Sequence, residues 1–175
     1  MGKIKNGYKV IKNILNEDEL NLLTNYTELY HRFNTKDFDI GGQNNNMDTC
    51  VYNDATFESL LLSKQKRIEQ EVDFKLFPTY VFWRMYTYGS VLEKHTDRPS
   101  CEISCTITLY SDGNDWPIYL GGTPVILKPG DGVIYEGCDI KHWREQYLGD
   151  GQSQVFLHYV DANGKYKDYK YRIEC

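Results

Sequence analysis

A chain of 175 residues with 41% hydrophobic and 26% charged residues has the size and composition of one globular domain. Its net charge of −5 and pI of about 5.4 argue against general attraction to nucleic acids or anionic membranes. The first residues lack the apolar core of a signal peptide, and no apolar run is long enough to cross a bilayer. The five cysteines form no CxxC pair. We therefore expect a single domain over residues 1–175, with reduced thiols and a cytoplasmic location.

The first half of the chain predicts two helices separated by a polar segment. Residues 8–14 read as a short strand, and the run that begins at Asn16 gives the capped start of a helix that continues to about residue 31. Residues 34–50 are rich in Gly and Asn and predict a loop, for which a lid and a plain connection are both open. Residues 55–73 carry one apolar stripe and predict a second helix, which Pro78 prevents from continuing.

From residue 79 onward the hydrophobic period changes to two, which predicts strands. After the strand that begins there, short strands are expected at 101–110, 116–120, 123–127, 132–135, 140–143, 154–160 and 166–173. Helices followed by many short strands favour an α+β protein with its helices packed against a β-sandwich.

His95-Thr96-Asp97 is the segment that most directly suggests chemistry. Side chains two apart on an extended segment point to the same side, so His95 and Asp97 present an imidazole and a carboxylate together. His142 follows another predicted strand and can complete a set of two histidines and one carboxylate. That set leaves open positions on an octahedral ion and is typical of non-haem Fe(II) oxygenases, although other metals suit the same ligands. The alternative is that all three are polar residues of a non-catalytic jelly roll.

The residues around this segment resemble a known family. The pattern Y-x-x-G-x-x-(Y/L)-x-x-H-x-D of prolyl-4-hydroxylase-like 2-oxoglutarate/Fe(II) dioxygenases is matched by Tyr86, Gly89, Leu92, His95 and Asp97. The turn at residues 129–131, before His142, is similar to the family's approach to its distal histidine. The resemblance covers about residues 8–161.

This resemblance implies both a fold and a reaction. The fold is a double-stranded β-helix (jelly roll) with the N-terminal helices packed on one sheet, and Fe(II) bound by His95, Asp97 and His142. The reaction is hydroxylation of a C–H bond in a peptidyl residue or a small molecule. It consumes 2-oxoglutarate as cosubstrate and O₂, and it releases succinate and CO₂.

The cosubstrate anchor departs from the family pattern. The family usually places Lys or Arg about ten residues after the distal histidine, but Gln152 stands there, with Gln154 beyond it. Arg144 is the nearest cation, and its guanidinium can bind the far carboxylate of 2-oxoglutarate in bidentate fashion. Our preferred anchor is therefore Arg144, with an ion pair to Glu145 at the surface as its alternative. The remaining candidates for cosubstrate contact are Arg84, Arg98, the Tyr86 hydroxyl and Gln154.

Two further residues and one further function are left open. His158 alternates with Gln154 on one face of a predicted strand, where it either lines the pocket or is a hydrogen-bonded core histidine. Glu102 either orients a ligand histidine or is exposed. In place of an oxygenase, a cupin-like binding module would hold a metal or ligand without turnover.

Overall fold

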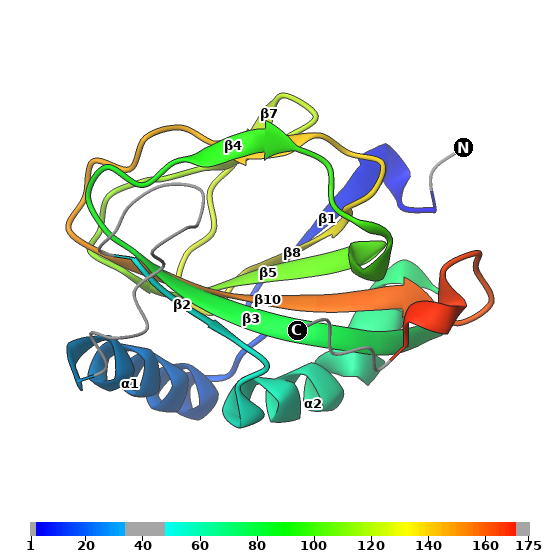
Figure 1. Cartoon of the computed structure of the whole chain (residues 1–175), viewed down its shortest axis with the longest axis horizontal. Helices are drawn as coiled ribbons and strands as arrows, with labels where there is room; N and C mark the ends of the chain where they lie inside the picture. The colour runs from blue at the N-terminus through cyan, green and yellow to red at the C-terminus, as the bar shows by residue number, and fades with distance from the viewer. Residues whose placement is uncertain (1–2, 34–47, 171–175) are drawn as a thin grey trace.

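Two antiparallel sheets face each other, and two helices cover the outer side of the larger one (Figure 1). The computed structural model describes residues 3–33 and 48–170. The six-stranded sheet has the order β1-β8-β5-β10-β3-β2, and the four-stranded sheet has the order β4-β9-β6-β7. The strands of the two sheets are β1 (Tyr8–Ile11), β2 (Thr49–Tyr52), β3 (Leu76–Tyr86), β4 (Leu92–His95), β5 (Ile103–Ser111), β6 (Ile118–Leu120), β7 (Thr123–Val125), β8 (Gly132–Glu136), β9 (His142–Arg144) and β10 (Gln152–Asp161). This is the predicted jelly roll.

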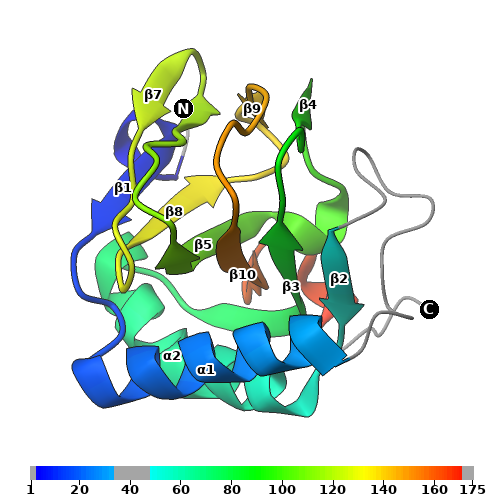
Figure 2. The same cartoon turned by 90° about the vertical axis from the view of Figure 1, so that its left-hand side faces the viewer.

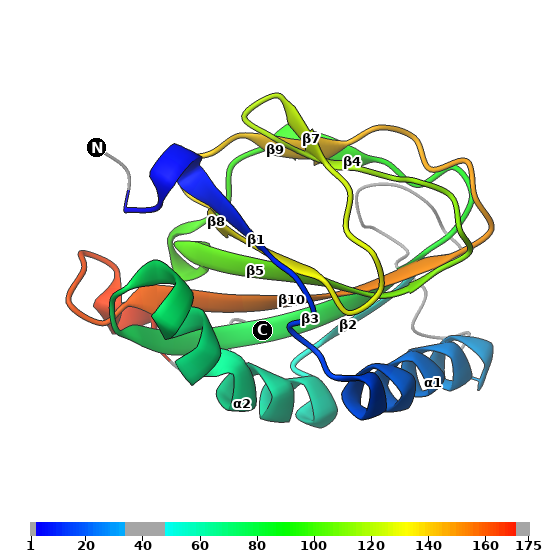
Figure 3. The same ribbon diagram turned by 180° about the vertical axis from the view of Figure 1, so that it is seen from behind.

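The two helices, α1 (Glu17–Phe33) and α2 (Ala55–Val72), begin at side-chain caps. Asn16 and Glu19 cap each other's backbone N–H groups at 2.9 and 2.8 Å, as the sequence predicted for α1. At the start of α2, the Asp54 carboxylate accepts from the N–H groups of Thr56 and Phe57. Both helices lie against the outer face of the six-stranded sheet (Figures 2 and 3), and neither is long and apolar enough to span a membrane.

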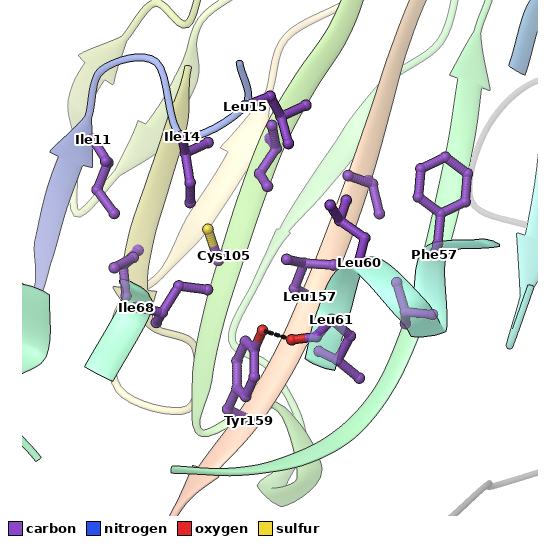
Figure 4. Close-up of a cluster of buried hydrophobic side chains, with 14 of the residues drawn as sticks. Ile11, Ile14, Leu15, Phe57, Leu60, Leu61, Ile68, Cys105, Leu157 and Tyr159 are labelled. Carbon is purple, nitrogen blue, oxygen red and sulfur yellow. Dashed lines mark hydrogen bonds between the residues drawn. The ribbon is translucent and has the colours of Figure 1, made fainter. Parts of the chain in front are cut away.

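Strand alternation separates an apolar layer from a polar one. On β10, Val155, Leu157 and Tyr159 pack into the hydrophobic core beneath the helices, where the Tyr159 hydroxyl donates to the Leu61 carbonyl at 2.7 Å (Figure 4). The intervening Phe156 and His158 line a cavity between the sheets. Alternate residues of the long strands therefore point in opposite directions, one set into the hydrophobic core and the other into the cavity between the sheets.

Several predicted boundaries were wrong. The edge strands β2 and β4 were missed, and β3 begins at Leu76 and continues through Pro78, beside a β-bulge. The predicted strand at 166–173 is not formed where the structure describes it, since residues 167–169 make the 3-10 turn η4. Its last three residues lie outside the described part, as do residues 34–47 of the predicted loop. No disulfide joins the cysteines within residues 3–33 and 48–170.

Candidate metal centre

His95, Asp97 and His142 come together at the paired ends of β4 and β9. His95 and His142 are cross-strand neighbours in this pair. The backbone N–H of Asp97 donates to the Gly137 carbonyl at 2.8 Å, which fixes the segment after β4 against the turn between β8 and β9. Asp97 Oδ1 then lies 3.5 Å from His95 Nε2 and 3.4 Å from His142 Nε2. Bonds of about 2.1 Å to an octahedral ion would place adjacent ligand atoms about 3 Å apart, so small shifts suffice to hold an ion.

Hydrogen bonds behind the three side chains orient their ligand atoms. Nδ1 of His95 contacts the Glu93 carbonyl at 2.7 Å, and Nδ1 of His142 contacts the Ile140 carbonyl at 3.0 Å. Because a carbonyl oxygen only accepts, Nδ1 carries a proton in both rings, and Nε2, which faces Asp97 Oδ1, is the nitrogen left to bind a metal. The Ser104 hydroxyl donates to Asp97 Oδ2 at 3.0 Å, which leaves Oδ1 as the oxygen nearest both imidazoles.

The charge of the centre favours a cation. Burial alone would raise the pKa of Asp97, but the imidazoles of His142 and His95 lower that pKa well below its usual value, so the carboxylate is ionised. The same contact with Asp97 raises the pKa of His95. Both expectations for Glu102 are wrong. It is 6% exposed, and it accepts from Lys3 Nζ and from the Asp161 backbone N–H rather than from a histidine.

The absence of a side chain at Gly137 leaves space for the Asp97 carboxylate. A Cβ atom at this position would lie 2.4 Å from Asp97 Oδ2 and 2.3 Å from the Cys101 carbonyl oxygen. Both distances are far below any ordinary contact, so only glycine fits beside the carboxylate in this arrangement.

A cavity of about 550 Å³ opens beside the three residues. Its wall is largely aromatic: the rings of Phe82 and Phe156 stack at 4.3 Å, and the Tyr80 and His158 rings stack at 4.5 Å. The residues that line it are Cys50, Tyr52, Tyr80, Phe82, Arg84, Tyr86, Leu92, His95, Thr96, Asp97, Arg98, Cys101, Tyr135, His142, Phe156 and His158. Such a mostly apolar pocket with a few converging polar groups is the usual form of a small-molecule site.

Arg144 lies between the sheets and is 1% exposed, so the expected alternative of a surface ion pair with Glu145 is wrong. Its guanidinium donates to the Trp116 carbonyl and, at 3.0 Å, to Gln154 Oε1. Burial lowers the pKa of Arg144 to about 10, which still leaves the group charged at neutral pH. No carboxylate of residues 3–33 or 48–170 pairs with it. Arg144 Nε and Gln154 Nε2 are also buried, and neither has a hydrogen-bond partner among the described residues. A buried cation with unpaired N–H donors beside it is a suitable binding site for an anionic group of a ligand.

The other candidate anchors have different surroundings. Arg84 lines the cavity and pairs with the buried Asp48, whose Oδ2 lies 2.9 Å from Arg84 Nη2. Arg98 is exposed and lies over the Tyr80 ring, 4.9 Å from its centroid. Tyr86 lines the cavity and packs edge-on against Trp116, which is also the ring beneath Arg144. The structure therefore groups Tyr86 and Gln154 with Arg144. Arg84 lies close to the same group, because its guanidinium is 4.9 Å from the Tyr86 ring centroid and it is the cross-strand partner of Gln154. Its ion pair with Asp48 distinguishes it from Arg144, and Arg98 lies apart, over Tyr80.

Sequence reasoning missed Ser104, Gly137 and Cys101 as parts of this centre. The sequence does contain a pattern that marks Ser104: it alternates with Thr106 and Thr108, which places the three on one polar face of β5. No local signal marks Gly137, whose importance depends on the approach of a segment forty residues earlier in the chain.

Comparison with known proteins gives structural likeness only. No protein-family model matches the chain, and no curated protein matches it in sequence. Among solved structures, the viral collagen prolyl hydroxylase vCPH from Paramecium bursaria Chlorella virus-1, solved as a 2-oxoglutarate complex, has a TM-score of 0.64 at 12% identity, over 87% of this chain and 95% of that one. A prolyl-4-hydroxylase from Pseudomonas putida has a TM-score of 0.67 at 13% identity, over 89% and 92% of the two chains.

HygX from Streptomyces hygroscopicus, solved with nickel and 2-oxoglutarate, has a TM-score of 0.66 at 14% identity, over 90% of this chain and 83% of that one. These likenesses extend over nearly the whole chain and agree with the observed sheet order. The chain therefore has the double-stranded β-helix fold of the 2-oxoglutarate/Fe(II) oxygenases.

Proposed function

We propose that this protein is a non-haem Fe(II)- and 2-oxoglutarate-dependent dioxygenase that hydroxylates a C–H bond, with succinate and CO₂ as co-products. The observation that carries the proposal is the convergence of two imidazole Nε2 atoms and one ionised carboxylate oxygen beside a cavity, in the fold of such oxygenases. His95, Asp97 and His142 would hold the ion, which supplies the oxygen chemistry when 2-oxoglutarate and O₂ are bound.

The residues present also fit the cosubstrate. Arg144 supplies a buried positive charge without a carboxylate partner in the described residues, and Arg144 Nε and Gln154 Nε2 offer idle donors. Tyr86 lies on the cavity side of the same group. We assign the far carboxylate of 2-oxoglutarate to Arg144, which would take the place of the family's usual cation in the slot of Gln152.

The chain's own contribution to the reaction is placement and exclusion of water. The backbone carbonyls of Glu93 and Ile140 keep both histidines in the tautomer that binds a metal. The stacked rings of the cavity wall hold an apolar part of the substrate away from solvent. The solved structures with this fold include prolyl hydroxylases and a protein solved with hygromycin B, so both a peptidyl residue and a small molecule remain candidate substrates.

The acidic charge balance and the cysteine pattern support the rest of the proposal: a cytoplasmic enzyme without a nucleic-acid or membrane partner. A cupin-like protein that binds a metal or ligand without turnover is the second candidate. Turnover separates the two, because only an oxygenase converts 2-oxoglutarate to succinate in the presence of O₂.

An anaerobic titration of the apoprotein with Fe(II) and 2-oxoglutarate tests the site. We expect the visible charge-transfer band of the iron–keto-acid chelate, its loss in His142→Ala, and a weaker affinity for 2-oxoglutarate in Arg144→Ala. Lys141→Ala is the matched control, because Lys141 adjoins His142 but is exposed. Admission of O₂ should then yield succinate.

Each contrary result has a distinct meaning. Absence of the band in folded wild-type protein would overturn the proposed site. If the affinity for 2-oxoglutarate, measured from this band, is unchanged in Arg144→Ala, the anchor is Arg84 or Arg98 instead. A band followed by no succinate under O₂, with and without candidate substrates, would favour the binding module.

A further inference from the structure

A second group of metal-binding side chains adjoins the three residues described above. One ligand atom from each of Asp97, Cys101 and His158 lies within 4.8 Å of the other two. The group shares only Asp97 with the His95–Asp97–His142 set. It differs in chemistry, because a thiol replaces one imidazole.

The two oxygens of the shared carboxylate have different neighbours. Oδ1 lies near His95 Nε2 and His142 Nε2. Oδ2 accepts from the Ser104 hydroxyl, which in turn contacts His158 Nδ1 at 2.9 Å. Because the single Ser104 hydrogen goes to the carboxylate, Ser104 accepts from His158 Nδ1–H, and His158 Nε2 carries a lone pair.

His158 independently points to a ligand. It is 3% exposed, lines the cavity, and its Nε2 atom has no hydrogen-bond partner among the residues that the structure describes. Burial lowers the pKa of His158 to about 4, so the imidazole is neutral at physiological pH. A neutral, buried imidazole with an unused lone pair is the form in which histidine binds metals.

Cys101 determines which ions suit the group. It is 2% exposed, and its Sγ lies 3.0 Å from the Tyr80 hydroxyl. Zn–S bonds of about 2.3 Å and Zn–N bonds of about 2.0–2.1 Å place the ligand atoms of a tetrahedral ion about 3.3–3.6 Å apart. The observed spacing therefore needs only a shift of about 1 Å or less per side chain, and a thiolate favours Zn²⁺ or Co²⁺ over harder ions.

We propose that Cys101, His158 and the Asp97 carboxylate form a second site, adjacent to the first, that takes a thiophilic divalent ion such as Zn²⁺ or Co²⁺. Binding exchanges the thiol proton for the metal, so M²⁺ and Cys101–SH give the metal thiolate and one H⁺. Burial and Asp97 raise the pKa of the Cys101 thiol to about 12, so the ion itself must displace the proton. The Tyr80 hydroxyl is placed to donate to the thiolate that results.

Cobalt titration of the anaerobic apoprotein tests this site, because sulfur ligation produces an intense sulfur-to-cobalt charge-transfer band. We expect the band in wild-type protein and in the double variant His95→Ala/His142→Ala, which keeps only the second site. The band should be lost in Cys101→Ser and weakened in His158→Phe. Cys138→Ser is the matched control, because Cys138 Sγ donates to the Arg98 carbonyl and lies outside the group.

X-ray absorption of the zinc-loaded wild-type protein provides a measurement that needs no variant. We expect a sulfur shell at about 2.3 Å. Cobalt uptake by the His95→Ala/His142→Ala variant without the band would overturn the proposal. A band that persists in Cys101→Ser, or the absence of a sulfur shell in protein that has bound two equivalents of zinc, would overturn it as well. None of these results affects the Fe(II)–2-oxoglutarate band, so the second site and the proposed oxygenase function fail or survive separately.

Discussion

Gly137 has no side chain, and the metal centre depends on that. In Gly137→Ala the new methyl group would meet Asp97 Oδ2 and the Cys101 carbonyl at less than 2.5 Å, so the carboxylate or the turn must move. We expect Fe(II) affinity to fall by about 10–100-fold, as when other supports of a ligand are altered. Competition with a fluorescent chelator measures this.

Gly151→Ala is the control for that substitution, because a Cβ atom there would make only ordinary contacts with Tyr110 and Met85, at 3.6 and 3.9 Å. Equal Fe(II) affinity of Gly137→Ala and wild-type protein would show that the carboxylate does not need this space.

At the scale of single residues, the sequence predicted the grouping but not its supports. The spacing of His95 and Asp97 on an extended segment, and the position of His142 after a strand, indicated that the three would meet, and the structure brings them together. Their binding of a metal remains a prediction. Ser104 and Gly137 were not predicted, because their contacts with Asp97 arise only when β5 and the turn after β8 pack against the segment after β4.

Asp54 joins the two helices at the start of α2. Its carboxylate caps the Thr56 and Phe57 N–H groups and also accepts from the Tyr26 hydroxyl of α1. Asp54→Ala should lower the free energy of unfolding by about 0.5–2 kcal/mol, the usual cost of losing an N-cap. Urea unfolding measures it. Asp73→Gly at the other end of α2 should cause no loss, because Asp73 has a φ of 64°, which glycine adopts without strain.

Asp112 ties the end of β5 to the loop before β10 and should make stability depend on pH. Burial alone would raise its pKa, but hydrogen bonds from the Asn114 N–H and the Tyr147 hydroxyl, among others, lower that pKa below its usual value. A lowered folded-state pKa stabilises the fold above the unfolded value, about pH 4, and this contribution is lost as the pH falls through the folded pKa.

Asp112→Asn removes the charge and should flatten this part of the dependence. Thermal unfolding between about pH 2 and 7 compares the two proteins. Parallel curves for wild type and variant would contradict the assignment.

Helices were more predictable than edge strands because their signals are local. The caps at Asn16 and Asp54 and the apolar stripes can be read from neighbouring residues. The strands β2 and β4 have four residues each and acquire their conformation from pairing with β3 and β9. The Tyr and Lys residues after position 165 resemble the pattern of a strand. Turn hydrogen bonds form there instead, such as that from the Tyr169 N–H to the Tyr166 carbonyl.

Across the whole molecule, the two sheets should differ in local stability. The long strands β3, β5 and β10 are packed on the helix core, whereas β4 and β9 pair at only two positions in register. Hydrogen exchange of the apoprotein should therefore be faster in β4 and β9 than in β10, since local opening follows the number of buried apolar contacts. Addition of Fe(II) should slow exchange in β4 and β9 and leave β10 unchanged. Uniform protection of both sheets in the apoprotein would contradict this difference.

The position of His142 and Arg144 on one short strand implies thermodynamic linkage between metal and cosubstrate. Both lie on β9, two residues apart, so any ordering of this strand by one ligand prepares the contact for the other. Cooperativity of this origin is reciprocal: Fe(II) raises the affinity for a dicarboxylate by the same factor as the dicarboxylate raises the affinity for Fe(II). Glutarate, which lacks the chelating keto group, is a suitable probe for calorimetry. A factor above one in both directions, and near one in Arg144→Ala, would mark β9 as the strand through which the two affinities are coupled.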